Sequence, residues 1–462
     1  MEATRYAPPR PSARHVPRER LLDLIASTPS GGLCAITGGP GFGKTQLLTD
    51  WCARSGVRAA WLSVDSSDND PARFWLHLSE ACRRAGILSE VGPGERNDVI
   101  GDLDAFVGQM NAAGDGDDVW LVMDDAHLLV DAALNADLAR FVGSLPDGVR
   151  VAVASRAELP WSLARWRARG LVVDLRERLL HLDLDEIDFL IAAAGVTAQP
   201  STVEQLRART EGWAAGVQLA IRSSLDSDDP ELYLAHVRGD DESIADFLLE
   251  EALDQRPPEQ RRFLLETSIL EQLSPALCDA VTGRRDSARM LAELARNHVL
   301  VTRLAGDDTA WYRCHALFSE VLRAELAADD PGLTAELHRR AGAWMADAGQ
   351  IDKAVHHLLA AGETDDAAAL VHAHEDEYFR CGQITLLRDW YATVALATDP
   401  NPDHELLRLV WASVASDDAP SSWEPALGQL RRRSSRTAAP DALTAELSVV
   451  DTHLAARVGD AA

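Results

Sequence analysis

The sequence predicts an α/β domain followed by all-helical domains, and three observations support this order. Five short apolar runs alternate with amphipathic stretches as far as about residue 175. Strand-like runs nearly disappear after that point, and from about residue 330 the chain is rich in alanine and leucine with helical periodicity. Short Val-, Leu- and Ile-rich runs separated by helical patterns are typical of a parallel sheet covered on both faces. The five runs are residues 33–37, 59–64, 119–123, 149–155 and 171–175.

The composition indicates a globular protein of several domains and argues against one class of function. A chain of 462 residues is too long for a single core. Its formal charge of -28, from 73 acidic and 45 basic side chains, argues against nucleic-acid binding by the chain as a whole. The basic cluster RRRSSR at 431–436 is more typical of a solvated helix face. Six scattered cysteines without a CxxC pair, and no apolar run that could span a bilayer, predict a cytoplasmic protein without membrane contact.

Two patterns predict the nature of the helical part. The apolar runs 298–304 and 310–318 flank the turn AGDD after a helical stretch, which suits the wing of a winged helix. Further on, AGQIDKAV (348–355) is echoed by AGETDDAA (361–368), each a turn followed by a helix start. Paired helices with this spacing indicate an α-solenoid of the tetratricopeptide (TPR) type, with an irregular helical bundle as the alternative. The proline- and serine-rich stretch 417–425 is expected to interrupt the array.

The eight residues GGPGFGKT at 38–45 form a phosphate-binding motif. They satisfy the pattern G-x-x-x-x-G-K-[ST] between a predicted strand and a predicted helix, where backbone N–H groups can surround phosphate oxygens. Lys44 would reach the β- and γ-phosphates, and the Thr45 hydroxyl would bind Mg²⁺. Gln46, the next residue, is also predicted to bind the nucleotide. Side chains at Gly41 or Gly43 would intrude on the phosphate, and Gly38, the first residue of the motif, is predicted to bind the nucleotide with them.

Polar residues at the ends of two further predicted strands complete this site. VWLVMDDAH places Asp124 and Asp125 at the carboxyl edge of the sheet, where ligands of α/β proteins bind. Asp124 is the better Mg²⁺ ligand, and Asp125 either polarises the attacking water or caps a turn. Arg156 ends the next strand and is predicted to contact the γ-phosphate, with a surface salt bridge as the alternative. An arginine acting in trans could come from 165–169, and the sequence does not choose among them.

These pieces, in this order, resemble the large ATP-binding LuxR-type transcriptional regulators of the maltose-activator kind, a branch of the signal-transducing (STAND) P-loop ATPases. The resemblance runs from residue 16 to about 370. Besides the P-loop it is carried by VPRERLLDLI (16–25), WLSVDSSDNDPARFWLHL (61–78), SRAELPWSLARWRARG (155–170), RTEGWAAGVQLA (209–220), FLLETSILEQLSPALCDAVTG (263–283) and WYRCHALFSEVLRAEL (311–326).

The resemblance implies a domain order and three further site residues. Val16 and Arg18 would line an adenine pocket, GWAAGVQLA would pack near the base, and His315 would reach the β-phosphate of bound ADP. The domains would be a flexible arm at 1–15, a P-loop ATPase domain at 16–180, a small helical domain at 181–255, a winged helix at 256–328 and a TPR-like sensor array, expected to be incomplete, at 329–462.

The resemblance also implies a switch. ADP would favour a closed monomer, whereas ATP together with a small-molecule or protein inducer on the helical repeats would favour an open, self-associating form, and slow hydrolysis would reset it. Such regulators end in a LuxR-type helix-turn-helix that we do not find in these residues, so DNA contact is expected only through a missing C-terminal domain. The alternatives are a metabolic P-loop kinase or ATPase, and a solenoid scaffold with a vestigial nucleotide site. Intact Lys44, Thr45 and Asp124 argue against the scaffold.

Overall fold

The computed structural model describes residues 5–9, 16–88, 103–113, 118–304, 310–397, 403–415, 420–434 and 446–452. The chain divides into two compact units, which are described separately. The first consists of residues 1–262 and 288–324, and the second of residues 263–287 and 325–462. Among the helices in the described ranges, we find none with the length and apolar character needed to cross a membrane.

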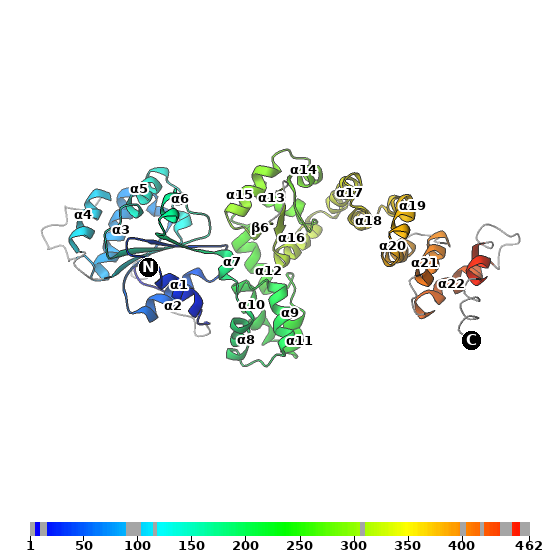
Figure 1. Cartoon of the computed structure of the whole chain (residues 1–462), viewed down its shortest axis with the longest axis horizontal. Helices are drawn as coiled ribbons and strands as arrows, with labels where there is room; N and C mark the ends of the chain where they lie inside the picture. Colours follow the sequence, from blue (N-terminus) through cyan, green and yellow to red (C-terminus); the bar gives the residue numbers. More distant parts are fainter. Residues whose placement is uncertain are drawn as a thin grey trace. The chain divides into compact units, whose positions relative to one another are not determined.

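A five-stranded parallel sheet forms the framework of the first unit (Figure 1). Its spatial order is β2-β3-β4-β1-β5, with every neighbouring pair parallel. The α/β prediction is confirmed, and each of the five predicted runs forms a strand. The strands are β1 (Leu33–Thr37), β2 (Arg58–Ser63), β3 (Val119–Asp124), β4 (Val149–Ser155) and β5 (Val172–Arg176).

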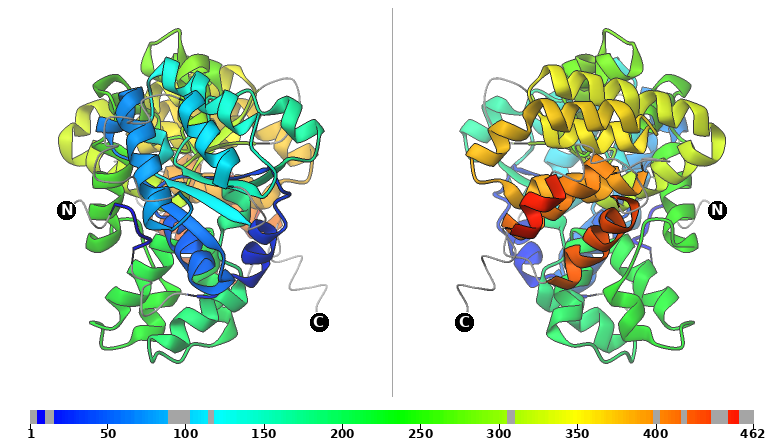
Figure 2. Two further views of the ribbon diagram at one scale, coloured as in Figure 1. Left: turned by 90° about the vertical axis from the view of Figure 1, so that its left-hand side faces the viewer. Right: turned by 90° about the vertical axis from the view of Figure 1, so that its right-hand side faces the viewer.

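Helices cover both faces of this sheet because alternate strand residues point to opposite sides (Figures 1 and 2). On one face, Leu121 and Val151 belong to a core that includes Trp75 and Phe141. On the other face, Trp120 packs edge-on against Trp51. Buried apolar contacts on both sides explain why the strands are continuous apolar runs. The helices of this domain are α1 (Glu19–Ala26), α2 (Lys44–Ser55), α3 (Pro71–Arg84), α4 (Leu103–Ala113), α5 (Ala132–Val142), α6 (Ala164–Ala168) and α7 (Glu177–Leu180), with short 3₁₀ turns η2 (Ser66–Asn69) and η3 (Ala126–Leu128).

A group of short helices follows the sheet. The first of them, α8 (Leu184–Ala193), begins with a capping box in which Asp183 and Glu186 each accept a hydrogen bond from the other's backbone N–H. Pro258 lies at the first position of α13, where a missing N–H costs nothing. The remaining elements are α9 (Pro200–Thr210), α10 (Ala214–Ser224), α11 (Pro230–Ala235), α12 (Glu242–Leu248), the π-helical turn η4 (Leu249–Leu253) and α13 (Pro258–Thr267).

The predicted wing is present as an antiparallel hairpin. Strand β6 (Val301–Arg303) pairs with β7 (Tyr312–Cys314), between α15 (Ser287–Arg296) and α16 (Ala316–Asp329). The turn AGDD lies outside the described residues. The second predicted strand, 310–318, was too long, because the backbone becomes helical at Ala316 directly after His315.

The second unit is helical, as predicted. Successive helices pack against one another, and the right-hand view of Figure 2 shows them stacked. The turns that begin α18, α19 and α20 each contain a glycine with positive φ, namely Gly349 (72°), Gly362 (80°) and Gly382 (73°), so the repeated pattern continues for one more turn than was predicted. The expected interruption at 417–425 was wrong for residues 420–425, which form the start of a helix with Pro420 at its first position. The helices are α14 (Pro275–Thr282), α17 (Pro331–Asp347), α18 (Ile351–Ala360), α19 (Thr364–Arg380), α20 (Ile384–Ala397), α21 (Asp403–Ala415) and α22 (Pro420–Ser434), and residues 446–452 are also helical.

Candidate functional site

The loop between β1 and α2 is folded around its own lysine. Gly41 and Gly43 have φ values of 74° and 75°, in the left-handed region that glycine enters at little cost. Lys44 begins α2, and its Nζ donates hydrogen bonds to the carbonyl oxygens of Gly38 and Gly39, both at 2.7 Å. An ammonium has three donors, so this arrangement leaves one N–H for an external acceptor. The loop therefore fits a phosphate group.

Lys44 is buried, and no carboxylate among the described residues is bonded to its Nζ. Only 7% of the surface of Lys44 is exposed. Burial, with a smaller contribution from the Arg156 guanidinium, lowers the pKa of the Lys44 ammonium to about 8, although Asp125 and Asp124 act in the opposite direction. An anion bound at the loop would restore the charged form. The electrostatics of the loop thus also fit a phosphate.

Asp124 and Thr45 lie together, as a shared cation would require. Thr45 Oγ1 donates to Asp124 Oδ1 at 3.2 Å, and the backbone N–H of Asp125 donates to the same oxygen at 3.1 Å. Asp124 is 4% exposed, and burial together with the Asp125 charge raises the pKa of its carboxyl to about 6. A hydroxyl and a buried carboxylate are oxygen ligands of the kind that Mg²⁺ accepts. These two residues would hold Mg²⁺.

Asp125 has an uncommon backbone conformation next to this pair. Its φ is 58°, which costs a non-glycine residue of order 1 kcal/mol or more and is concentrated at functional sites. Its side chain is 41% exposed, and its Oδ1 lies 3.8 Å from His127 Nδ1. Burial lowers the pKa of His127 to about 4, and the cations Arg156, Lys44 and Arg256 contribute. Sequence reasoning missed His127 and Arg256.

Arg156 follows β4 at the carboxyl edge of the sheet, where the sequence placed it. Its Nη1 donates to Glu251 Oε2 at 2.6 Å. Glu251 belongs to the π-helical turn η4, far along the chain. The predicted phosphate-contacting arginine is thus held by a carboxylate that the sequence did not point to.

The segment GWAAGVQLA packs directly on the P-loop. The buried indole of Trp213 donates from Nε1 to the carbonyl oxygen of Pro40 at 3.0 Å. The backbone N–H of Ala215, in the first turn of α10, donates to the carbonyl oxygen of Gly41 at 2.9 Å. The glycine-rich loop and the helical domain therefore share two hydrogen bonds.

Val16 and Arg18 line a small cavity of about 50 Å³ beside the P-loop. Gly43, Gln46 and Ala214 line the same cavity. Arg18 is 6% exposed, and its Nη2 donates to the Leu180 carbonyl at 2.7 Å. Its Nε donates to Glu186 Oε1 in α8 at 3.4 Å, so its side chain also bridges to the helical domain. The cavity therefore adjoins the P-loop at Gly43.

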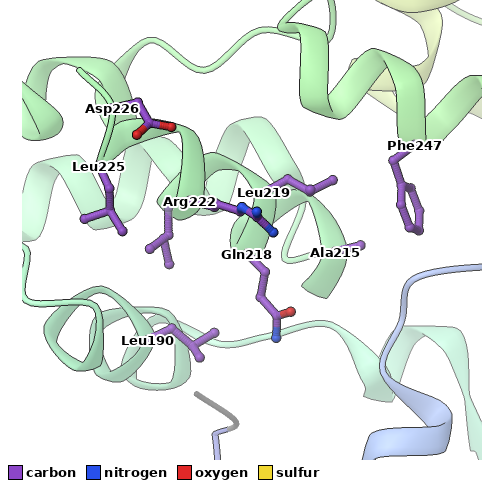
Figure 3. A pocket seen from close by; sticks show the side chains of 9 residues that line it. Leu190, Ala215, Gln218, Leu219, Arg222, Leu225, Asp226 and Phe247 are labelled. Carbon is purple, nitrogen blue, oxygen red and sulfur yellow. The ribbon is translucent and has the colours of Figure 1, made fainter. Parts of the chain in front are cut away.

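A larger cavity of about 590 Å³ adjoins it. The two share Leu190 and Gln218, and Figure 3 shows that Arg222 and Asp226 project from the same helical region toward the larger cavity. Phe247 lines its other side. None of the P-loop residues 38–45 lines it, so we do not assign the phosphates there.

His315 is buried behind Trp213. Its Nε2 donates to the carbonyl oxygen of Thr210 at 3.0 Å, and its ring centroid lies 5.9 Å from that of Trp213. Burial lowers the pKa of His315, which keeps the ring neutral. Its described contacts therefore reach the P-loop through Trp213, which holds Pro40.

Another histidine of the winged-helix region lies nearer to the loop. His298 Nδ1 donates to Glu177 Oε2 at 2.9 Å, and the same oxygen accepts the backbone N–H of Gly39 at 3.0 Å. A Cβ on Gly39 would lie 2.6 Å from the His298 carbonyl oxygen. The sequence analysis missed both His298 and Glu177. Glu177 directly follows β5, so the rule that ligands bind at the carboxyl edge of the sheet could have identified it.

The second unit contains a cavity of its own, of about 530 Å³. Glu375 in its wall accepts a hydrogen bond from Tyr391 and forms an ion pair with Arg408. Most of the other lining side chains are apolar. The cavity is lined by Glu375, Asp376, Phe379, Ile384, Leu387, Tyr391, Arg408, Trp411, Ala412, Val414 and Glu446.

These features define a P-loop NTPase fold: a parallel sheet, a glycine-rich loop with its lysine, and the paired Thr45 and Asp124. Helical and winged-helix regions follow this fold in the chain. Comparison with known proteins narrows this class. Residues 249–334 match the sequence model of the MalT winged helix domain. The resemblance to maltose-activator regulators that the sequence indicated is thereby confirmed.

Curated relatives align over most of the chain. The serine/threonine-protein kinase PknK of Mycobacterium tuberculosis is 30% identical over 457 residues, which cover 96% of this chain and 41% of that protein. The HTH-type transcriptional regulator MalT of Vibrio cholerae is 28% identical over 403 residues, covering 82% of this chain and 43% of that protein. The chain thus spans less than half the length of these relatives.

Two solved structures are similar at lower identity. The Walker-type ATPase PABY2304 of Pyrococcus abyssi aligns with a TM-score of 0.49 and 14% identity, over 68% of this chain and 98% of that one. The STAND protein with a tetratricopeptide repeat sensor, PH0952 from Pyrococcus horikoshii, aligns with a TM-score of 0.35 and 16% identity, over 92% of this chain and 59% of that one.

Proposed function

We propose that this chain is the ATP-binding, slowly hydrolysing switch of a transcriptional regulator, organised in the domains predicted from the sequence. One observation carries the proposal: the atoms of the P-loop also form the junction with the helical domain, through the bonds of Trp213 and Ala215 to the carbonyls of Pro40 and Gly41. A ligand that moves this loop changes that junction. A ligand shifts such an equilibrium by its differential affinity for the two states.

The chain's own residues have defined roles in this proposal. Lys44 donates its third N–H to a phosphate oxygen, and the loop amides surround the phosphates. Thr45 and Asp124 hold Mg²⁺, which when bound neutralises charge on the phosphate oxygens. Asp125 orients the attacking water, and Arg156 contacts the terminal phosphate once it is free of Glu251.

Hydrolysis returns the protein to the diphosphate form. ADP then favours the closed monomer, and ATP favours a self-associating form. The resemblance to MalT supports this assignment.

We place the effector in the cavity of the second unit. Its volume suits a small molecule, since ligand pockets are apolar clefts of roughly 300–1,000 Å³ with a few oriented polar groups. Asp376 and Glu446 are exposed at its wall, whereas Glu375 is already engaged by Tyr391 and Arg408. An apolar molecule with a positively charged group fits this lining. Trp411→Ala is expected to abolish a fluorescence response to such a compound, and a retained response would reject the site.

The name of the relative PknK raises protein phosphorylation as a second activity. Protein kinases cover the phosphates with a G-x-G-x-x-G loop and take their lysine from a separate strand. The described site instead has the lysine at the helix start, within the glycine-rich loop itself. This geometry favours the regulatory ATPase over a protein kinase. A screen for phosphotransfer to protein and small-molecule acceptors separates the switch from both a protein kinase and a metabolic kinase: only ATP-to-ADP conversion should be seen, without phosphate on any acceptor.

Calorimetry with Mg·ADP and Mg·ATP tests the phosphate assignment. The chain has two lysines, Lys44 and Lys353, which provide a matched pair of variants. Lys44→Ala is expected to lower affinity for both nucleotides at least a hundredfold, because a buried charge-assisted contact is lost. Lys353→Ala lies in the helical array and should bind as the wild type does. Equal affinities for wild type and Lys44→Ala would reject the phosphate assignment, whereas binding of neither nucleotide by the wild type would favour the vestigial scaffold.

A further inference from the structure

The ion pair between Arg156 and Glu251 joins the end of strand β4 to the π-helical turn η4. Arg156 Nη1 lies 2.6 Å from Glu251 Oε2, and the two side chains are 27% and 31% exposed. Such π-helical turns are rare within helices and are frequent at functional sites. The turn brings a carboxylate from a segment 95 residues away onto the arginine.

Arg156, the arginine of this pair, acts electrostatically on residues at the P-loop. The Arg156 guanidinium lowers the pKa of Lys44 and the pKa of His127, so its charge acts directly on the P-loop lysine. A carboxylate and a terminal phosphate are both negative, and both accept hydrogen bonds from the same face of a guanidinium. Glu251 and a terminal phosphate on the P-loop therefore compete for Arg156.

A second arginine in the same segment has no acidic partner among the residues that the structure describes. Arg256 lies five residues beyond Glu251 (256 − 251), and its Nε is buried without a hydrogen bond. The charged group that acts on it is Arg156, and burial is the main reason that the pKa of Arg256 is lowered. A half-buried guanidinium beside another guanidinium is costly unless an anion joins them. Glu251 is paired with Arg156 alone, and Arg256 beside it is left without an acidic partner among the described residues, which leaves room for another negative group.

We propose that Glu251 determines which nucleotide this conformation prefers, by occupying on Arg156 the position that the terminal phosphate of a nucleoside triphosphate would take. The inference rests on the proposed nucleotide switch and adds its selectivity. In the arrangement described here, a diphosphate binds without disturbing the pair. A triphosphate must displace Glu251 and then gains Arg156 and Arg256. Glu251 is a positioning residue, because it acts through Arg156.

Paired nucleotide affinities test this inference. Calorimetry with Mg·ADP and with Mg²⁺ and the non-hydrolysable adenosine 5′-(β,γ-imido)triphosphate gives the ratio of the two dissociation constants. Glu251→Gln keeps the shape of the side chain and removes its charge. It is expected to tighten triphosphate binding by roughly tenfold relative to diphosphate, since one charge-assisted contact no longer competes. Glu250→Gln, at the exposed neighbouring position, should leave the ratio unchanged.

Further variants separate an effect on nucleotide selectivity from a structural effect. In an Arg156→Ala background, Glu251→Gln should no longer change the ratio, because the group through which it acts is absent. Arg256→Ala should weaken triphosphate more than diphosphate by roughly tenfold, whereas Arg261→Ala, which removes an exposed ion pair with Asp254, should not. If Glu251→Gln does not fold, Glu251→Asp, which keeps the charge but shortens its reach, should shift the ratio in the same direction by less.

The outcomes are distinct. A Glu251→Gln variant that changes both affinities equally, or changes the ratio equally with and without Arg156, would overturn the inference while leaving the proposed switch intact. Binding of neither nucleotide by the wild-type protein would overturn both.

Discussion

Two glycines of the P-loop share a backbone conformation but differ in their surroundings, which makes them a matched pair for testing the junction with the helical domain. A Cβ at Gly41 would lie 2.6 Å from Ala215 Cβ and 2.8 Å from Trp213 Nε1. At Gly43 the nearest atom, Ala214 Cβ, would be 4.0 Å away. Their φ values are 74° and 75°. Alanine therefore costs about 1–2 kcal/mol at either position from the left-handed backbone alone.

Gly41→Ala carries an additional cost. Placing a methyl group into a packed interface costs about 1–3 kcal/mol, because Ala215 and Trp213 must move. We expect Gly41→Ala to lose about 2–5 kcal/mol in the free energy of unfolding of the first unit and Gly43→Ala about 1–2 kcal/mol. Nucleotide affinity should show the reverse ranking, because Gly43 precedes Lys44 at the helix start, where phosphate approaches.

Urea unfolding followed by circular dichroism, with calorimetry for nucleotide binding, measures both quantities. Equal losses of unfolding free energy in the two variants would refute the reasoning, since the packing of α10 on the loop would then contribute nothing.

Three other predictions concern the rest of the molecule. Asp125→Asn should leave nucleotide affinity within about twofold but slow phosphate release in a steady-state assay by roughly a hundredfold, as expected for loss of a group that orients water; an unchanged rate would leave Asp125 as a turn residue. His315→Ala should speed the release of fluorescent ADP in stopped flow, because it removes support from Trp213; an unaltered dissociation rate would make His315 a core residue only. Burial, and to a lesser extent the neighbouring His338, lowers the pKa of His357 to about 3. Below pH 6.5, the ordinary pKa of histidine, this side chain takes up a proton in the unfolded chain but not in the folded chain, so the free energy of unfolding decreases as the pH falls. Between pH 7 and pH 5 the second unit should lose about 2 kcal/mol in its free energy of unfolding, so its melting temperature should fall over that range, and His357→Gln should reduce this pH dependence. An equal change of melting temperature with pH in the wild type and the variant would reject this assignment.

The framework of the first unit was well predicted because the strands of a buried parallel sheet have continuous apolar sequences. The five runs matched the strands to within about a residue, and the loop pattern located Lys44 and Thr45 between β1 and α2. The rule that ligands gather at the carboxyl edge also led to Asp124 and Arg156. Each of these inferences uses neighbours in the chain or a property of the sheet as a whole.

The remaining site residues depend on contacts that no local pattern records. Glu251 meets Arg156 across 95 residues, and His298 meets Glu177 across 121. An isolated glutamate or histidine within a helical stretch has no spacing that distinguishes it from a surface side chain. The helix start at Ala316 was missed because the aromatic residues Trp311 and Tyr312 before it and Phe318 after it give one continuous strand-like composition, whereas the backbone turns at His315.

The central claim is that the nucleotide on the P-loop decides how the helical regions are held. Small-angle X-ray scattering coupled to size-exclusion chromatography measures this directly on three samples: the empty protein, the protein with Mg·ADP, and the protein with Mg²⁺ and the non-hydrolysable triphosphate. We expect a compact monomer with diphosphate and an expanded or self-associated particle with triphosphate. Identical radii and masses in all three samples, under conditions where calorimetry shows both nucleotides bound, would contradict the account.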